Sequence, residues 1–345
     1  MSFLRKLFRR GADEPPVNQP AVAEPAPAEV AVEPEPAPPI QPPAAGAVEP
    51  APVAEEPAAA VDLDGTHELV PTAPLAVTTI NSQRGLAAWA ARDLGRVRRN
   101  NQDSVYAMLM SVPDREHDQP IGLFVVADGM GGHEGGEIAS RRAIETVMVS
   151  VLEQLVLPAM ADEEPGSALQ LLMVTALQDA NARIYAEARE RGSDMGTTCT
   201  AALLHGGGLY VAHVGDSRAY LLTESGAQII TADHSTVGRL IAMGQIPPEA
   251  AREHPLRNQL YRTVGQHPEV QVDFVYQSTA GASHLLLCSD GLWGMIDDDE
   301  IAAVIAESPW PQDACHRLIA RANMAGGDDN ISAVVVSLPV ERPGT

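Results

Sequence analysis

Lysine is almost absent from this 345-residue sequence: Lys6 is the only one, so arginine supplies nearly all of the positive charge. The 23 basic residues are outnumbered by 46 Asp and Glu, which gives a formal net charge of −23. This excess of negative charge argues against nucleic acid or an anionic membrane as the main partner. No apolar run is long enough to indicate a transmembrane segment.

Cysteine is also scarce. The sequence contains Cys199, Cys288 and Cys315, an odd number without the spacing of metal ligands. Two of them lie in expected strands, so we predict buried, reduced thiols in a cytoplasmic protein.

Lys and Arg are missing altogether between Arg10 and Arg84. Pro, Ala, Glu and Val dominate this stretch, and such a composition cannot bury enough apolar surface to offset the entropy of ordering. We therefore predict a disordered, acidic linker over residues 11–83, whose prolines favour extended polyproline II.

Residues 1–10 precede this linker as a short basic segment. Its apolar side chains fall on one helical face: Phe3, Leu4, Leu7 and Phe8. The segment is a candidate membrane-surface anchor or partner-binding helix. An isolated helix of this length is marginal in water, so the pattern alone settles neither role.

From residue 84 to about residue 340 the composition is that of one globular domain. Its patterning predicts strands over 85–93, 104–109, 123–127, 197–205, 209–214, 219–222, 228–231, 270–277, 284–289 and 331–338. Helices are expected over 138–155, 168–191, 298–306 and 312–325, and the polar segment 234–267 is expected to be partly helical. Strands in antiparallel-looking groups and helices in pairs indicate a layered α+β sandwich.

The stretch from Leu123 to Glu137 has the pattern of a site. Its apolar run ends on the carboxylate of Asp128, and five glycines follow within the next eight residues. A buried strand would hold the carboxylate in place, while the glycines would let the backbone approach a ligand closely. An Asp-Gly pair at a strand end is, by itself, more often a plain turn.

Three further carboxylates lie where expected strands begin or end. Asp290 follows the apolar run 285–288, Asp329 precedes the last strand, and Asp103 precedes an early one. Each of them alone would be a turn residue, but collecting all four charges in one place would require cations. Because the set offers only oxygen ligands, we expect hard divalent ions, Mg²⁺ or Mn²⁺.

An anionic substrate would also need a positive group. Arg96, Arg98 and Arg99 lie shortly before Asp103, and an arginine there can bind a phosphoryl group through two hydrogen bonds. On an exposed loop such arginines are more often merely solvated. We interpret the segment Gly215–Arg218, between two expected strands, as a tight turn with a structural hydrogen-bonding role.

Seven motifs follow one another over residues 84–338: Arg98–Asp103 (RRNNQD), Ala127–His133 (ADGMGGH), Met195–Thr198 (MGTT), Gly215–Arg218 (GDSR), Asp233–Ser235 (DHS), Ser289–Leu292 (SDGL) and Asp329–Asn330. Together they resemble the motifs of the metal-dependent PP2C (PPM) protein phosphatases. More narrowly, they resemble the bacterial serine/threonine phosphatases that oppose Hanks-type kinases. One such motif is weakly specific, whereas seven in the family's order are highly specific.

The resemblance implies a four-layer α-β-β-α sandwich of two antiparallel sheets flanked by helices, with two Mn²⁺ or Mg²⁺ ions at one end. Asp128 matches the ligand that bridges the ions, and the carbonyl of Gly129 matches a ligand of the second ion. Asp290 and Asp329 match the remaining ligands of the first ion. A hydroxide bridging the two metals would then attack phosphorus in line.

Other positions carry further roles by the same resemblance. Asp103 matches the residue that orders metal-bound water, and Arg98 matches the phosphate-binding arginine. Residues 234–267 match the flap beside the active site, which varies within the family and influences substrate choice.

The sequence also departs from the family's pattern. Gln102 stands where many members have Glu, and Met130 stands where eukaryotic members have a His proposed as general acid. Bacterial members often share this Met, so activity is not excluded. Without the His, the proton for the leaving group must come from elsewhere, such as water. We interpret His133 as structural and Asp194 as a candidate ligand of a third, weaker divalent ion.

The expected function is therefore hydrolysis of phosphoserine and phosphothreonine in proteins, with a Ser/Thr kinase and its substrates as partners. Two alternatives stay open: a non-catalytic pseudophosphatase that binds phosphoproteins, and a partner-switching phosphatase acting on an anti-sigma antagonist. The presence of Asp128, Asp290 and Asp329 favours an enzyme over the pseudophosphatase. We expect a cytoplasmic monomer.

Overall fold

The computed structural model describes residues 85–112, 119–132, 135–161, 168–247, 250–251 and 254–339. The predictions made for residues 1–10 and 11–83, and for His133, lie outside these residues. They stay predictions.

The described strands form two antiparallel sheets. The first sheet has the order β1 (Ala87–Asp93), β11 (Ile331–Ser337), β10 (Ala282–Cys288), β7 (Arg218–Thr223), β8 (Gly226–Ile229). The second has the order β2 (Asp103–Val112), β3 (Gln119–Met130), β5 (Cys199–His205), β6 (Gly208–Val214), β9 (Asp273–Ser278), and the short β4 (Gly196–Thr197) pairs with the end of β3.

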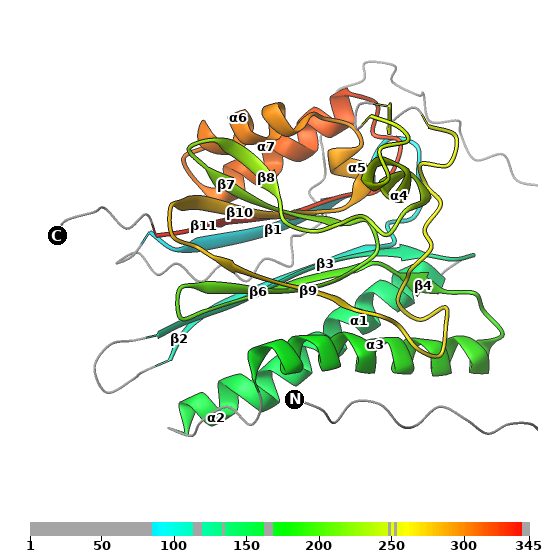
Figure 1. Ribbon diagram of the computed structural model, residues 1–345, viewed down its shortest axis with the longest axis horizontal. Helices are drawn as coiled ribbons and strands as arrows, with labels where there is room; N and C mark the ends of the chain where they lie inside the picture. The colour runs from blue at the N-terminus through cyan, green and yellow to red at the C-terminus, as the bar shows by residue number, and fades with distance from the viewer. Residues whose placement is uncertain are drawn as a thin grey trace, which may run out of the picture. The chain divides into compact units, whose positions relative to one another are not determined.

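Helices cover the outer face of each sheet (Figure 1). The second sheet is covered by α1 (Gly135–Val151), a π-helical turn (Leu152–Val156), α2 (Leu157–Met160) and α3 (Leu169–Arg191). The first sheet is covered by α6 (Asp298–Ala306) and α7 (Pro311–Met324), while α4 (Thr236–Ala242) and α5 (Asp290–Trp293) lie at one end. The four-layer α-β-β-α sandwich expected from the sequence is thus confirmed.

The alternation of side chains along β3 explains why its centre is a continuous apolar run. Leu123, Val125 and Ala127 pack against the helices of the outer layer. Phe124 and Val126 pack in the core between the two sheets. Because successive side chains of a strand point to opposite faces, Asp128 continues the inner face and lies at the end of the inter-sheet core.

One described helix, the continuous run Gly135–Met160, is long and apolar enough to cross a membrane by length and mean hydropathy alone. Its side chains Ala143, Val147 and Leu155 are instead buried in the core beneath the second sheet. This is the packing of a core helix, so the run is weak evidence for a membrane span.

The three cysteines are free and buried, as the sequence predicts. Cys199 begins β5, Cys288 ends β10, and Cys315 lies in α7. Burial raises the pKa of all three thiols, which keeps them protonated and unreactive at neutral pH.

Candidate active site

Two of the predicted carboxylates are neighbours across a strand pair. Asp103 begins β2 and is in register with Asp128 near the end of β3. Residues directly opposite each other in an antiparallel pair have side chains on the same face, so both point toward the inner face of the sheet. Asp103 is fully buried, and its Oδ2 accepts a hydrogen bond of 2.8 Å from the hydroxyl of Ser289.

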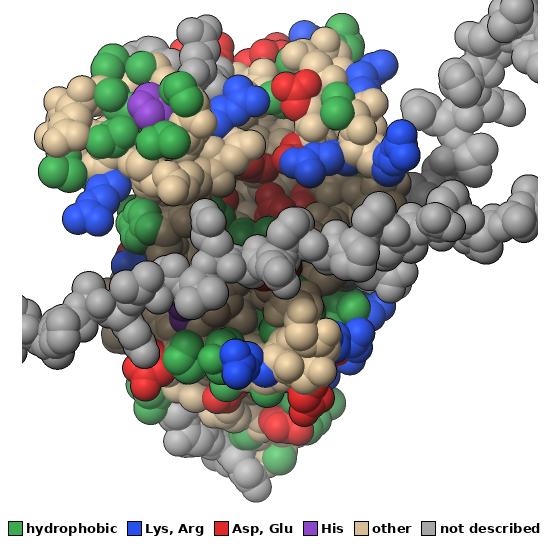
Figure 2. All heavy atoms as spheres, turned by 90° about the vertical axis from the view of Figure 1, so that its right-hand side faces the viewer, with side chains coloured by type: hydrophobic (Ala, Val, Ile, Leu, Met, Phe, Trp, Pro, Cys, Tyr) green, Lys and Arg blue, Asp and Glu red, His purple; other side chains and the backbone are tan. Residues whose placement is uncertain are grey.

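The other two carboxylates come from the first sheet. Asp290 is the first residue of α5, two residues after the end of β10, and Asp329 lies two residues before β11. These strands are neighbours in the sheet, so both carboxylates arrive at the same end of the sandwich as Asp103 and Asp128. Figure 2 faces this end and shows acidic side chains in a hollow, with basic side chains at its rim.

Burial and the charges of neighbouring carboxylates raise the pKa values of three of these carboxyl groups. Burial, followed by the charges of Asp329 and Asp103, raises the pKa of Asp290 to about 7. Burial raises the pKa of Asp103 to about 6, although the Ser332 and Ser289 hydroxyls oppose the shift. Burial and the charges of Asp103 and Asp290 raise the pKa of Asp128 well above its ordinary value. The protein alone therefore holds this cluster in an electrostatically costly arrangement.

Divalent cations would fit this cluster. Oδ1 of Asp103 and Oδ1 of Asp290 are both buried and accept no hydrogen bond from the described residues. Buried acceptors of this kind are costly unless a partner satisfies them, and carboxylate oxygens are the ligands that Mg²⁺ and Mn²⁺ prefer. Over the described ranges, no three His, Cys, Asp or Glu side chains are grouped closely enough to close a metal site by themselves. Water and backbone carbonyls would have to supply the remaining ligands.

Gly129 has such a carbonyl and directly follows one of the carboxylates in the chain. It lies in β3 directly after Asp128 and pairs with Thr197 of β4. Its N–H donates to the carbonyl of Gln102 at 3.1 Å, which fastens the end of β3 to the segment that leads into β2.

Arg98 lies over the same cluster. Its Nη2 is 2.6 Å from Oδ2 of Asp329, and the arginine side chain remains 50% exposed. Partial burial lowers the pKa of Arg98, but the charges of Asp329, Asp290 and Asp128 outweigh this effect and raise it. The guanidinium group is thus both held by the acidic centre and open to a ligand from solvent.

Asn330 is a structural residue of the site whose role sequence reasoning did not assign. Its Oδ1 accepts from the backbone N–H of Gln102, and its Nδ2 donates to the carbonyls of Leu94 and Asn100. This one side chain therefore fixes the Arg98 loop against the start of β11. The sequence signal for this residue was its place in the pair Asp329–Asn330, the last of the seven motifs.

The structure also locates the residues that depart from the family's pattern. Gln102 donates from Nε2 to the carbonyl of Gly131, and Met130 ends β3 opposite Gly196. Asp194 lies apart from the four carboxylates, in the loop after α3, where it lines a cavity of about 460 Å³ with Gly132. Its role as a third metal ligand stays a prediction.

A second network of side chains holds the two ends of the flap, residues 234–267. His213 and His234 stack with ring centroids 4.8 Å apart. His234 Nε2 lies 3.1 Å from Oδ2 of Asp273, and the other oxygen of Asp273 binds Arg262. The network anchors both ends of residues 234–267 to strands β6 and β9.

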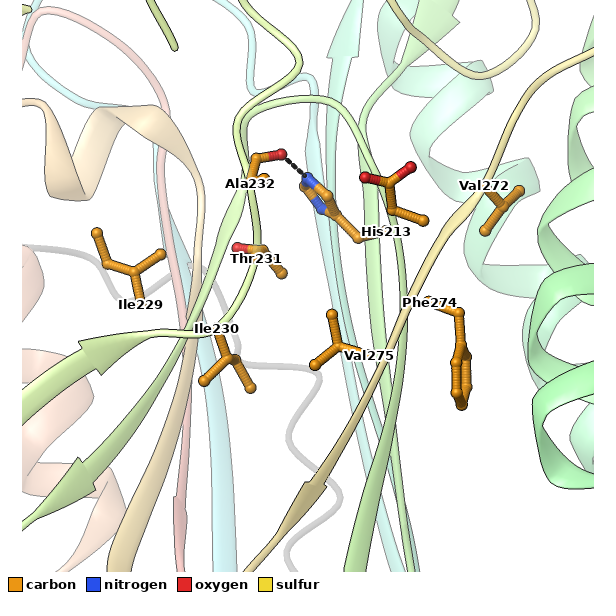
Figure 3. Close-up of a pocket in the computed structure, with 9 residues that line it drawn as sticks. His213, Ile229, Ile230, Thr231, Ala232, Val272, Phe274 and Val275 are labelled. Carbon is orange, nitrogen blue, oxygen red and sulfur yellow. Dashed lines mark hydrogen bonds between the residues drawn. The ribbon is translucent and has the colours of Figure 1, made fainter. Parts of the chain in front are cut away.

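A separate cavity of about 420 Å³ opens beside this network, between the ends of β8 and β9. Figure 3 shows His213 on its wall, with Nε2 bonded to the carbonyl of Ala232 at 3.0 Å. Apolar side chains form much of the rest: Ile229, Ile230, Val272, Phe274 and Val275. The cavity contains none of the four carboxylates and is not the candidate active site.

His213 should make folding pH-dependent. Burial, aided by the charge of His234, lowers its pKa to about 4 from about 6.5, so below pH 6.5 the unfolded chain binds more protons than the folded one. The free energy of unfolding contributed by this site should therefore fall by up to about 1.4 kcal/mol per pH unit as the pH drops from about 6.5 to about 4. Urea unfolding of wild type and His213→Gln across this window measures the effect, because the carboxylates are common to both proteins. A pH-independent difference between the two would contradict the prediction.

The fold and the site together define a class of protein. Its members are four-layer α+β sandwiches with a cluster of carboxylates that requires cations and an exposed arginine beside the cluster. Residues 97–322 match the family model of protein phosphatase 2C. The chain therefore belongs to the protein phosphatase 2C family, and the family membership inferred from the seven motifs is confirmed.

Named relatives agree with this assignment. The chain is 37% identical over 256 residues to the serine/threonine protein phosphatase PstP of Mycobacterium tuberculosis, which covers 72% of this chain and 45% of that protein. It is 34% identical over 254 residues to the serine/threonine phosphatase stp of Listeria monocytogenes, covering 73% and 96%. The crystal structure of the catalytic domain of PstP in complex with two manganese ions superposes with a TM-score of 0.60 at 35% identity, covering 74% of this chain and 99% of that one. The chain thus matches somewhat less than half of full-length PstP.

Proposed function

We propose that this protein hydrolyses phosphoserine and phosphothreonine in proteins at a two-metal centre held by Asp128, the Gly129 carbonyl, Asp290 and Asp329. The observation that carries the proposal is the cluster of mutually destabilised carboxylates, two of which keep a buried oxygen that accepts no hydrogen bond from the described part of the chain. The manganese complex of the PstP catalytic domain supports the choice of metal. When bound, two Mn²⁺ or Mg²⁺ ions would supply a water of lowered pKa and balance charge on the phosphoryl oxygens.

The chain's own residues would bind and orient the substrate. We propose that Arg98 donates two hydrogen bonds to the phosphoryl group, and its ion pair with Asp329 supports this role by holding the guanidinium group beside the acidic centre. We propose that Asp103 accepts a hydrogen bond from the attacking water at Oδ1, which accepts none from the described residues, while the Ser289 hydroxyl donates to the other oxygen. Met130 cannot donate a proton, so the serine or threonine oxygen that leaves phosphorus would take its proton from solvent.

The partners are proposed from chemistry and from the relatives. Phosphorylated proteins are the substrates that the family implies, and we propose a Ser/Thr kinase and its targets among them. Three buried free thiols support a cytoplasmic location, and the net charge of −23 opposes binding to nucleic acid. We also propose that the protein acts as a monomer, which sedimentation analysis would test.

One assay tests the proposed function directly. Hydrolysis of phosphothreonine peptides by the full-length protein should require Mn²⁺ or Mg²⁺, stop with a chelator and return when metal is added in excess. Metal binding without hydrolysis of any of several phosphopeptides would instead identify a pseudophosphatase. Hydrolysis that resists the chelator would overturn the two-metal centre.

Replacing Arg98 should weaken substrate use without removing the metals. Charge-assisted hydrogen bonds contribute roughly 1.5–3 kcal/mol, so Arg98→Ala should lower kcat/KM by roughly 10- to 150-fold. Arg99→Ala is the matched control, because Arg99 is an exposed arginine next to Arg98 on the same loop. If Arg98→Ala kept the wild-type kcat/KM, Arg96 or Arg99 would become the candidate for phosphate binding.

A further inference from the structure

The turn Gly215–Ser217, between β6 and β7, is buried at the same end of the sandwich. Asp216 is only 5% exposed and Ser217 is fully buried. Gly215 has a φ of +114°, and a Cβ there would lie 2.5 Å from Cβ of Thr198. A turn that lies in solvent needs neither this burial nor this close packing. The segment Gly215–Ser217 therefore does more than connect two strands.

Hydrogen bonds fasten this turn to the strand that carries Asp128. The hydroxyls of Ser217 and Thr198 are 2.7 Å apart. The Thr198 hydroxyl in turn accepts from the backbone N–H of Asp128 at 2.9 Å. The side chain of Thr198 therefore links the Ser217 hydroxyl to the backbone N–H of Asp128.

A second set of contacts fastens the turn to the helix that carries Asp290. Trp293 of α5 donates from Nε1 to the backbone carbonyl of Asp216 at 3.0 Å. Arg218 stacks on the ring of Trp293 at 3.6 Å and forms an ion pair with Asp233. The turn thus lies between the two elements that present Asp128 and Asp290.

The electrostatics place the Asp216 carboxyl group next to this centre. Burial first, and then the charge of Asp290, raise the pKa of Asp216 well above its ordinary value. The charge of Asp216 in turn helps to raise the pKa of Asp128. Arg218 lowers the pKa of Asp216 only in part, since its guanidinium group is bonded to Asp233 through Nε and Nη2. Asp216 is therefore a fifth carboxyl group of the acidic cluster.

We propose that Asp216 is a positioning residue of the metal centre: its buried carboxylate, in the turn that lies between the elements carrying Asp128 and Asp290, increases the affinity of these two residues for divalent cations. The inference rests on the proposed function. Outer groups that orient metal ligands typically contribute 10- to 100-fold in affinity, and a buried negative charge near two ligand carboxylates acts in the same direction. Asp216 would not bind the phosphoryl group itself.

The test is Mn²⁺ affinity measured without turnover, by calorimetry on the full-length, chelator-treated protein. Asp216→Asn should bind Mn²⁺ roughly 10- to 100-fold more weakly than wild type. Its phosphopeptide hydrolysis should be low at limiting Mn²⁺ and should recover as Mn²⁺ is raised, because the ligands themselves are intact. Unchanged Mn²⁺ affinity in Asp216→Asn would overturn the proposal.

Two controls separate charge from folding. Ser217→Ala removes a buried hydrogen bond from the same turn without changing its charge, and should retain more Mn²⁺ affinity than Asp216→Asn. Asp298→Asn removes a carboxylate that accepts from the Tyr220 hydroxyl, and should leave Mn²⁺ affinity unchanged. If Asp216→Asn fails to fold, the pair Asp216→Glu and Asp216→Gln decides: Glu should bind Mn²⁺ more tightly than Gln, and equal affinities would overturn the proposal.

The same titration distinguishes this inference from the proposed function. If Asp290→Asn loses Mn²⁺ binding while Asp216→Asn keeps it, only the role of Asp216 is wrong. If neither substitution changes Mn²⁺ binding, the metal centre itself is wrongly assigned.

Discussion

Asp290→Asn should abolish phosphopeptide hydrolysis and remove most of the stabilisation that Mn²⁺ gives to the folded protein. The substitution keeps the shape of the side chain at the start of α5 but removes one negative charge and one anionic ligand oxygen. Because the nucleophile depends on the metals, activity should fall by more than the roughly 100-fold expected for a residue that only supports a ligand.

Without metal, the Asp290→Asn protein should be at least as stable as the wild type at pH 7. The pKa of Asp290 is raised to about 7, so the folded state binds its proton more tightly than the unfolded state does. Ionised Asp290 therefore destabilises the metal-free fold increasingly as the pH rises from about 4 to about 7. Removing this carboxylate should leave the melting temperature at pH 7 level or higher in the presence of a chelator.

Titrating Mn²⁺ while following the melting temperature and hydrolysis tests these expectations together. By mass action, wild type should gain about 2.7 kcal/mol when Mn²⁺ reaches 100 times its Kd, whereas the variant should gain much less at the same concentration. Asp328→Asn is the matched control, because Asp328 is an exposed carboxylate next to Asp329. Wild-type activity and wild-type metal stabilisation in Asp290→Asn would rule out the two-metal assignment.

The sequence allowed the layers of the fold to be predicted because strand and helix periodicity depends on local composition. The run Leu123–Ala127 predicted a buried strand, and β3 does bury both of its faces there. The strand also continues to Met130 through a glycine, because β4 pairs with Gly129 and Met130. No local pattern reports a pairing partner 66 or 68 residues away in the chain. The helix α5, four residues long, is too short to produce a periodic signal.

The candidate site divides in a similar way. Asp103, Asp128, Asp290 and Asp329 could be named from the sequence because each one ends or begins an expected strand. The role proposed for Asp216 could not be, since its burial depends on Trp293, which lies 77 residues further along the chain. A polar turn residue and a buried carboxylate of an acidic centre have the same local sequence, and only the stacking of the two sheets distinguishes them.

Gly129 offers the second large effect, and it is a steric one. A Cβ on this residue would overlap the carbonyl group of Gly136 and lie 2.5 Å from the carbonyl oxygen of Gln102. Both are backbone groups that cannot rotate away, so the end of β3 would have to move relative to α1 and to the segment before β2. Because the Gly129 carbonyl and the Asp128 carboxylate are both proposed metal ligands, this shift would misplace two of them at once.

Gly129→Ala should therefore lower both stability and metal response. Overpacking of a tight interior typically costs roughly 1–3 kcal/mol, and the Mn²⁺-dependent rise in melting temperature should largely disappear. Gly132→Ala is the matched control in the same glycine-rich stretch, because a Cβ there meets no heavy atom within 4 Å. That control should change the free energy of unfolding by less than about 0.5 kcal/mol. Urea unfolding with and without Mn²⁺ measures both quantities, and a Gly129→Ala protein that behaves like Gly132→Ala would show that the close contact between β3 and α1 does not fix the metal centre.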